Sequence, residues 1–365
     1  MRPYHLLLTL LVLAGLLAAV ACSGDDDDTG GTPAAQTSAP AASVGPTGAA
    51  SPTEVSGSVT VYSGRSEELV QPVLDDFEAA TGIEVNVRYG DTAELAATIL
   101  EEGGNSPADL YFAQDAGALG ALAAEGRLAE LPDEILQLVP SQYRSPSGLW
   151  VGISGRARVV AYNTDVLSPD DLPGSILDFT DPQWDGRIGW APTNGSFQAF
   201  VTALRLTEGE EEARAWLEGI LDNNPTEYPN NTTAVDGVAN GEVDVAFVNH
   251  YYLYRFLEEQ GMGFPARNYF LDAGDPGALV NVAGAAVLDS ADHPDAALKL
   301  IEYMLSQEGQ QYFSDETYEY PLVEGVEPSF DLLPLSEIDP PDIDLSDLDD
   351  LEGTLDLLRE TGALP

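Results

Sequence analysis

Short apolar runs alternate with longer segments of helical spacing along most of the chain after residue 57. The first run, VTVY, has the β-rich composition of a strand, and the segment behind it repeats apolar residues every three or four positions, as one face of a helix does. Gly, Asn and Thr residues lie where the predicted strands and helices should end. The spacing predicts strands at 59–62, 83–89 and 108–112, with helices at 67–80 and 92–102. This order predicts a parallel sheet covered on both faces.

The same rhythm continues in the second half of the chain, so we expect an α/β protein with two lobes. The further predicted strands lie at 158–163, 187–191, 243–249 and 280–288, and the further helices at 196–206, 209–221 and 294–305. Near the C-terminus, leucines recur at three- and four-residue steps between many carboxylates, which predicts one amphipathic helix. These leucines are Leu345, Leu348, Leu351, Leu355 and Leu358.

The N-terminus has the pattern of a targeting segment. A short region with Arg2 precedes an apolar run over 6–17, which is too short for a comfortable permanent membrane span, and small residues then lead to Cys22. Residues 1–21 therefore resemble a bacterial lipoprotein signal, with Cys22 as the lipidated residue; an ordinary secretory signal is the alternative. Residues 22–57 are poor in large apolar residues and are predicted to be a flexible tether. We expect lipid anchoring at the outer face of the cytoplasmic membrane or in the periplasm.

Charge and cysteine content exclude several classes of function. The chain has 14 Lys+Arg against 62 Asp+Glu, a formal net charge of −48, so a nucleic acid would be repelled. A single cysteine excludes a disulfide framework and any multi-cysteine metal site. The sequence contains no GxSxG, P-loop or HExxH motif. We therefore expect a protein that is not an enzyme.

The most informative segment is NHYYLYR at 249–255. It follows a predicted strand and begins a helical pattern, which places it at the carboxyl end of a strand, where α/β sheets bind ligands. Adjacent residues face opposite sides within a strand, but a strand-to-helix turn allows Tyr251 and Tyr252 to converge. Phenolates are hard oxygen donors that suit Fe³⁺. A free phenol keeps its proton up to a pH near 10, and a bound metal ion displaces that proton. Aromatic packing at a helix start is the alternative.

Three other loops fall at strand or lobe junctions and carry polar groups. Residues 193–197 (TNGSF) offer backbone N–H groups at a helix N-terminus, which can hold an anion or simply cap the helix. Arg65 follows the first strand as an available counter-charge, and Gln114 and Asp115 follow the third. Residues 154–158 (SGRAR) lie where the chain would cross between lobes.

Several motifs in order resemble the ferric-iron-binding periplasmic proteins of iron ABC importers. They are VYSGRSEELVQPVLDDFEAATGI, SPADLYFAQDAGALG, SGRARVVAYNT, DPQWDGRIGWAPTNGSFQAF and NGEVDVAFVNHYYLYRF. The resemblance implies a type II, transferrin-lobe-like periplasmic-binding-protein fold with a hinge and an interlobe cleft. It implies Fe³⁺ with carbonate or phosphate as synergistic anion, and a monomer that delivers to an ABC permease. We expect one lobe over 58–157 and 282–330 and the other over 158–281 and 331–365.

Carried over position by position, the resemblance makes Tyr251 and Tyr252 the metal ligands. It assigns the anion to Asn194, Gly195 and Ser196, supported by Asn231 and Asn249. The chain departs from the family where Ser66 replaces a histidine ligand, Glu67 a tyrosine found in some members, and Gln114 a glutamate. Bound anions steadied by Arg65 or Arg156 are expected to fill the open positions; Glu67, Gln114 or Asp115 are the alternatives.

Two other functions stay open from the sequence. The same architecture serves other small solutes, such as an oxyanion, a phosphonate or a polyamine. A surface hydrolase or adhesin on a lipid anchor is a more distant alternative. The favoured interpretation is capture of Fe³⁺ with its anion, closure of the two lobes around the site, and delivery to a permease.

Overall fold

The computed structural model describes residues 57–328 and 330–365. The expected signal segment, Cys22 and all but the last residue of the tether lie outside the described residues. Within the described part, no helix combines the length and the apolar character needed to cross a membrane.

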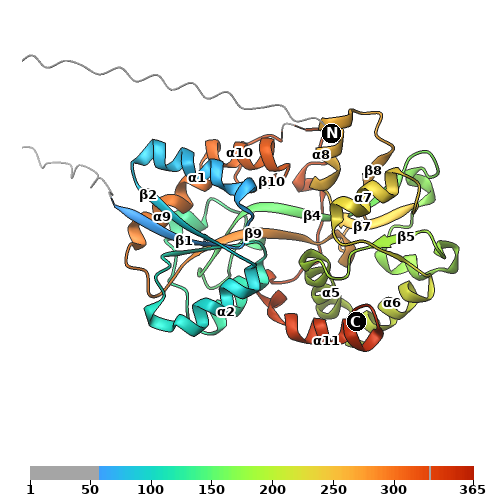
Figure 1. Ribbon diagram of the computed structural model, residues 1–365, viewed down its shortest axis with the longest axis horizontal. Helices are drawn as coiled ribbons and strands as arrows, with labels where there is room; N and C mark the ends of the chain where they lie inside the picture. The colour runs from blue at the N-terminus through green and yellow to red at the C-terminus, as the bar shows by residue number, and fades with distance from the viewer. Residues whose placement is uncertain (1–56, 329) are drawn as a thin grey trace, which may run out of the picture. The chain divides into compact units, whose positions relative to one another are not determined.

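The first sheet has the strand order β2-β1-β3-β9-β4. Strands β1 (Ser58–Ser63), β2 (Glu84–Tyr89) and β3 (Leu110–Ala113) are parallel, whereas β9 (Val280–Val287) runs antiparallel to β3. Figure 1 shows α1 and α10 on one side of this sheet and α2 on the other. The helices are α1 (Glu67–Thr81), α2 (Thr92–Glu102), α3 (Ala116–Ala124), α4 (Asp133–Leu136), α9 (Pro294–Met304) and α10 (Gln307–Thr317).

The second sheet is built on the later part of β4 (Val151–Asn163). Alternate residues of its strands enter different cores: Val160 and Phe247 pack in the larger core, whereas Val159 and Val248 pack in a separate cluster with α7 and α8 residues. Its other strands are β5 (Ile188–Trp190), β6 (Thr226–Glu227), β7 (Val245–Asn249) and β8 (Ala266–Tyr269). Its helices are α5 (Gly195–Glu208), α6 (Glu210–Asp222), α7 (Asn231–Ala239) and α8 (Tyr251–Gln260).

Strand β4 belongs to both sheets. Its first half pairs with β9 and with β10 (Tyr320–Pro321), and its second half pairs with β7 and β8 (Figure 1). The first three strands are parallel, as their order in the sequence predicted, but all of these β4 pairings are antiparallel, so each sheet as a whole is mixed. The sequence pattern shows which segments are buried strands, but it contains no signal for the direction in which a distant partner runs.

The C-terminal segment differs from the single helix that its leucines predicted. Leu345 and Leu348 lie in a 3₁₀ turn, η8 (Leu345–Asp349), and only then does α11 (Leu351–Thr361) begin. Asp350 has non-helical backbone angles (φ −79°, ψ 61°), and its carboxylate caps α11 by accepting the N–H of Gly353. The turn packs on α3, whereas α11 packs on α5 and α6, so the leucines serve two different surfaces.

Candidate metal centre

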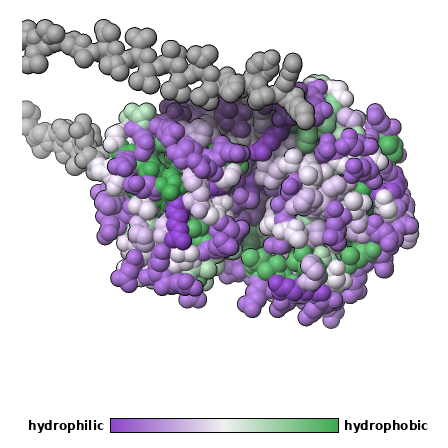
Figure 2. Space-filling view, in the orientation of Figure 1, coloured by the Kyte–Doolittle hydropathy of each residue, from purple (hydrophilic) through white to green (hydrophobic). Residues whose placement is uncertain are grey.

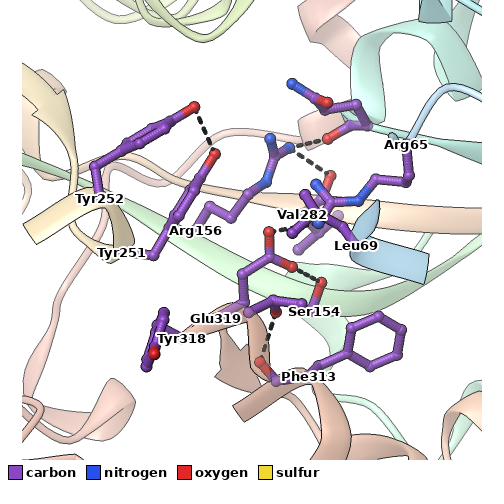
Figure 3. Close-up of polar contacts among 12 residues, drawn as sticks. Arg65, Leu69, Ser154, Arg156, Tyr251, Tyr252, Val282, Phe313, Tyr318 and Glu319 are labelled. Carbon is purple, nitrogen blue, oxygen red and sulfur yellow. Dashed lines mark hydrogen bonds and ion pairs between the residues drawn. The ribbon is translucent and has the colours of Figure 1, made fainter. Parts of the chain in front are cut away.

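Two tyrosine hydroxyls meet at the junction between β7 and α8. Strand β7 ends at Asn249, His250 is the N-cap of α8, and Tyr251 and Tyr252 form its first turn. Tyr251 donates to the hydroxyl of Tyr252 across 2.9 Å, and the ring centroids are 4.2 Å apart with an interplanar angle of 29°. Figure 3 shows both hydroxyls directed toward one another on the side of Arg156. The convergence expected from a strand-to-helix turn is therefore confirmed.

The surroundings of Tyr251 disfavour a free phenolate. Tyr251 is 4% exposed, and burial raises the pKa of its hydroxyl well above the usual value, with Tyr252 adding to the shift. The positive charges of Arg156 and Arg65 act in the opposite direction but do not reverse it. A bound cation would supply the missing positive charge, because coordination replaces the proton on each oxygen.

His250 fixes the start of α8. Its Nδ1 accepts the backbone N–H of Ala157 at 3.2 Å, which leaves Nε2–H to donate to the carbonyl of Tyr318 at 2.9 Å. The ring stacks on Tyr320 with centroids 4.5 Å apart. Burial lowers the pKa of His250 to about 4, so the imidazole is neutral near neutral pH. The tyrosine pair is thus attached to β4 and to the segment around β10.

A cavity of about 530 Å³ lies between α2 and α3 on one side and α5 on the other. Figure 2 shows the surface hollowed between these parts of the molecule, with mostly hydrophilic residues in the depression. It is lined by polar groups from both sheets together with small apolar residues. Those relevant to the site are Thr92, Gln114, Asp115, Arg156, Arg158, Asn194, Gly195, Ser196, Asn249 and Asn281.

Two arginines of β4 enter this cavity wall. Arg156 and Arg158 are two positions apart, and both are buried. Arg156 donates to the carbonyls of Gln114 and Val282, and Arg158 donates to Oδ1 of Asn249 at 3.2 Å. Burial lowers the pKa of Arg158 to about 10. No carboxylate of residues 57–328 or 330–365 forms a direct ion pair with either guanidinium, so both are available to an anion in the cavity.

The 194–196 turn is organised by two asparagines. Oδ1 of Asn194 accepts the N–H of Ser196 at 3.0 Å and also its hydroxyl. Asn231 is fully buried; its amide donates to Ser196 Oγ at 3.1 Å and to Asn194 Oδ1 at 3.3 Å, whereas its own Oδ1 has no partner. Space is open around Gly195, where an added Cβ would meet no atom within 4 Å. The turn thus offers an open surface at the N-terminus of α5, where an anion could approach.

The remaining expected ligands lie in less direct positions. Arg65 is absent from the cavity lining, and its guanidinium pairs with Glu319 at 2.7 Å. Glu67 is exposed on the first turn of α1. Asp115 lines the cavity, but its carboxylate caps α3 by accepting the N–H of Ala118 at 3.1 Å, and burial raises its pKa. Gln114 lines the cavity, and its backbone carbonyl accepts from Arg156.

Carboxylates do not gather into a metal site here. Among the described residues, no three His, Cys, Asp or Glu side chains are grouped so as to hold a metal ion. The oxygen donors that the structure does bring together are the two phenols, beside the arginines that could hold an anion. This donor set suits a hard trivalent cation accompanied by a hard anion.

Three residues of this region were not among the predicted ligands. Arg158 could have been found from the SGRAR motif, because residues two apart on a strand share a face. His250 precedes the tyrosine pair directly, but its partners lie 93 and 68 residues away. Glu319 is one of 62 acidic residues, and its sequence neighbourhood contains nothing that points to Arg65.

Comparisons with known proteins identify a family to which this chain is similar. The family of bacterial extracellular solute-binding proteins matches residues 73–332. The major ferric iron-binding protein of Neisseria meningitidis is 37% identical, over 83% of this chain and 92% of that protein. The Fe(3+)-binding periplasmic protein of Serratia marcescens is 33% identical, over 84% and 90%.

Solved structures of similar proteins lead to the same family. Iron-bound HitA from Pseudomonas aeruginosa matches with a TM-score of 0.78 and 40% identity, over 84% of this chain and 99% of that chain. The Trichodesmium protein IdiA (FutA), in complex with iron and citrate, matches with a TM-score of 0.74 and 31% identity over the same shares. These relatives bind solutes and are not enzymes, and their two-lobed type II fold is that of the present structure. The chain therefore belongs to the bacterial extracellular solute-binding proteins, in the family that includes the ferric iron-binding proteins.

Proposed function

We propose that this chain captures Fe³⁺ on Tyr251 and Tyr252, together with a carbonate or phosphate ion, and delivers it to an ABC permease. The observation that carries the proposal is the pair of phenols whose oxygens lie 2.9 Å apart at the end of β7. Two phenolates offset two of the three charges of Fe³⁺ and leave coordination positions open. An anion held by Arg156 and Arg158 fills the open positions and offsets the remaining charge.

Relatives support the choice of iron as cargo. The Neisseria and Serratia proteins are named for ferric iron, and the Pseudomonas structure contains iron. The Trichodesmium structure holds iron with citrate, which is a carboxylate anion rather than carbonate or phosphate. In the present chain, the Asn194–Ser196 turn and the side chain of Asn249 complete the anion site. Glu67, Gln114 and Asp115 are the alternative protein ligands, and among them only Gln114 and Asp115 line the cavity.

Capture requires movement around the site. We propose a first lobe over 58–157 and 282–330 and a second over 158–281 and 331–365, with β4 and β9 as the connection about which the lobes close. Closure over Fe³⁺ and its anion would join Gln114 and Asp115 on one lobe to the Asn194 turn on the other. Such ligand-dependent contacts are what shift the equilibrium toward the closed form.

The proposed place of action is outside the cytoplasmic membrane. The lipoprotein-like signal and the tether would attach the chain through Cys22 to the outer face of the membrane, as a monomer close to its permease. The relatives that carry the word periplasmic in their names act in the same kind of compartment.

One observation favours a second candidate, the binding of an oxyanion without iron. The two buried arginines without carboxylate partners are suited to sulfate, phosphate or a phosphonate. They do not explain the tyrosine pair, whose hydroxyls have no role in binding an anion that Arg156 and Arg158 already hold. Iron with an anion uses both features, and we therefore favour it.

A spectral titration separates the candidates. Adding ferric citrate to the full chain in bicarbonate buffer should produce a visible phenolate-to-Fe³⁺ charge-transfer band that saturates at one equivalent. Sulfate, a phosphonate and a polyamine, each without iron, should not raise the unfolding temperature as much as iron with bicarbonate does. Stabilisation by an oxyanion alone, without any coloured iron complex, would show that the second candidate is right.

A further inference from the structure

Glu319 connects three parts of the chain that meet beside the tyrosine pair. Its Oε1 accepts from Nη2 of Arg65, in the loop after β1, at 2.7 Å, and its Oε2 accepts from the hydroxyl of Ser154 in β4. The Arg65 and Glu319 side chains are 1% and 0% exposed. Figure 3 shows this carboxylate between Ser154 and the two arginines. The iron-binding scheme above does not use it.

The backbone on both sides of Glu319 is held in place. Tyr318 has a left-handed conformation (φ +59°), and its carbonyl accepts from His250. Tyr320 pairs with Gly155 of β4 and stacks on His250. The carboxylate therefore has little freedom to follow Arg65, so Arg65 must take the position that Glu319 sets.

The charges explain why this position matters. Burial acts to raise the pKa of Glu319, but Arg65 and Arg156 outweigh burial and hold it below its usual value, so the carboxylate is ionised. Both arginines also act electrostatically on Tyr251. Arg156 faces the cavity without a carboxylate partner, whereas Arg65 is compensated. Glu319 therefore forms its direct ion pair with Arg65, whereas Arg156 hydrogen-bonds only to backbone carbonyls and remains available to an anion in the cavity.

We propose that Glu319 is a positioning residue for ferric-ion binding, acting through Arg65. This inference rests on the proposed function. The carboxylate holds the Arg65 guanidinium in its buried pocket and cancels its charge. Without the negative charge of Glu319, the positive charge of Arg65 would repel Fe³⁺ at the phenolates. Arg65 would also compete for the anion that should bridge the metal and Arg156.

The test is a double-mutant cycle on the full chain. The variants Glu319→Gln, Arg65→Gln and the double variant are titrated with ferric citrate in bicarbonate buffer, and the charge-transfer band is followed. Glu319→Gln is expected to weaken iron binding by at least about tenfold, because it leaves a buried cation unpaired. It should also shift the band maximum, a change that loss of fold stability alone does not cause. The double variant should bind iron no more weakly than Arg65→Gln, because Glu319 acts on iron binding only through Arg65.

A control variant and the double variant separate a specific effect on iron binding from a general loss of stability. Asp244→Asn breaks a different arginine–carboxylate pair, Arg187–Asp244 at 2.5 Å, and should leave the titration unchanged; Asp244 directly precedes β7, whereas the tyrosines follow its other end. If Glu319→Gln does not fold, the double variant, a neutral pair of similar size, still has to match Arg65→Gln. Iron binding by Glu319→Gln with wild-type affinity and spectrum would overturn the inference, as would a double variant that shows the sum of the single losses. A wild-type chain without a coloured iron complex would instead overturn the proposed function.

Discussion

His250 donates from Nε2 to the carbonyl of Tyr318 across 2.9 Å, although 68 residues separate them. The same ring accepts the N–H of Ala157 on its other nitrogen. Because a protonated imidazole has no acceptor, this second bond exists only for the neutral ring. The neutral imidazole of His250 therefore fixes the start of α8, where the tyrosine pair lies, and protonation of this ring would break one of its two hydrogen bonds.

This arrangement predicts a loss of stability in acid for the iron-free protein. The folded pKa of His250 is about 4, below the unfolded value of 6.5, so between these values the unfolded chain binds a proton that the folded chain does not. The stabilisation is complete above pH 6.5 and is lost as the pH falls toward 4. The shift corresponds to about 3 kcal/mol of unfolding free energy. Urea unfolding at several pH values measures it. In His250→Gln this part of the pH dependence should disappear, and an unchanged slope would contradict the role of the ring.

Removal of the anion should weaken iron binding. With carbonate and phosphate stripped from the buffer, we expect at least about a tenfold loss of Fe³⁺ affinity, because the metal and two buried guanidinium groups would lose a shared partner. Arg158→Gln should reduce the response to added bicarbonate. Arg187→Gln, a loss of positive charge outside the cavity lining, is the matched control. An affinity that does not depend on the anion would favour Asp115 or Glu67 as the ligand.

The contact of the C-terminal segment with α3 depends on a glycine. A Cβ on Gly120 would lie 2.1 Å from the carbonyl oxygen of Ser346, so Gly120→Ala should force η8 away from the helix. We expect a loss of about 1–3 kcal/mol, the usual range for overpacking. Gly104→Ala is the control, because nothing lies within 4 Å of its Cβ position. Urea midpoints compare the two variants, and equal midpoints would show that η8 does not need this approach.

The anchor is tested separately from the site. Cys22→Ala should release the chain from membranes, because the variant lacks the cysteine that would carry the lipid anchor. Fractionation of cells into membrane and soluble protein measures this. The iron titration of the released variant should equal that of the wild type. Retention of the variant in the membrane fraction would argue against lipidation at this cysteine.

The sequence predicted best what is determined locally. The helix over 67–80 and the strand over 59–62 are within one residue of α1 and β1 at each end, because their apolar spacing and their terminating residues lie within the elements themselves. The convergence of Tyr251 and Tyr252 was predictable for the same reason: it follows from one turn between a strand and a helix.

What the sequence could not predict depends on distant partners. The antiparallel direction of β9 is set by pairing with β3 and β4, far away in the chain. The break at Asp350 is stabilised by Arg205, whose guanidinium lies 2.8 Å from that carboxylate across 145 residues. The pairing of Arg65 with Glu319 spans 254 residues. No periodicity within a window of the sequence contains such information.

The central claim is that the paired phenols hold the metal, and the variants Tyr251→Phe and Tyr252→Phe test it most directly. Both keep the ring packing and remove only the hydroxyl, and Tyr254→Phe, in the same helix, is the matched control. In a ferric titration in bicarbonate buffer, we predict that each of the first two variants loses the visible band, while Tyr254→Phe retains it. Full colour in both Tyr251→Phe and Tyr252→Phe would contradict the account.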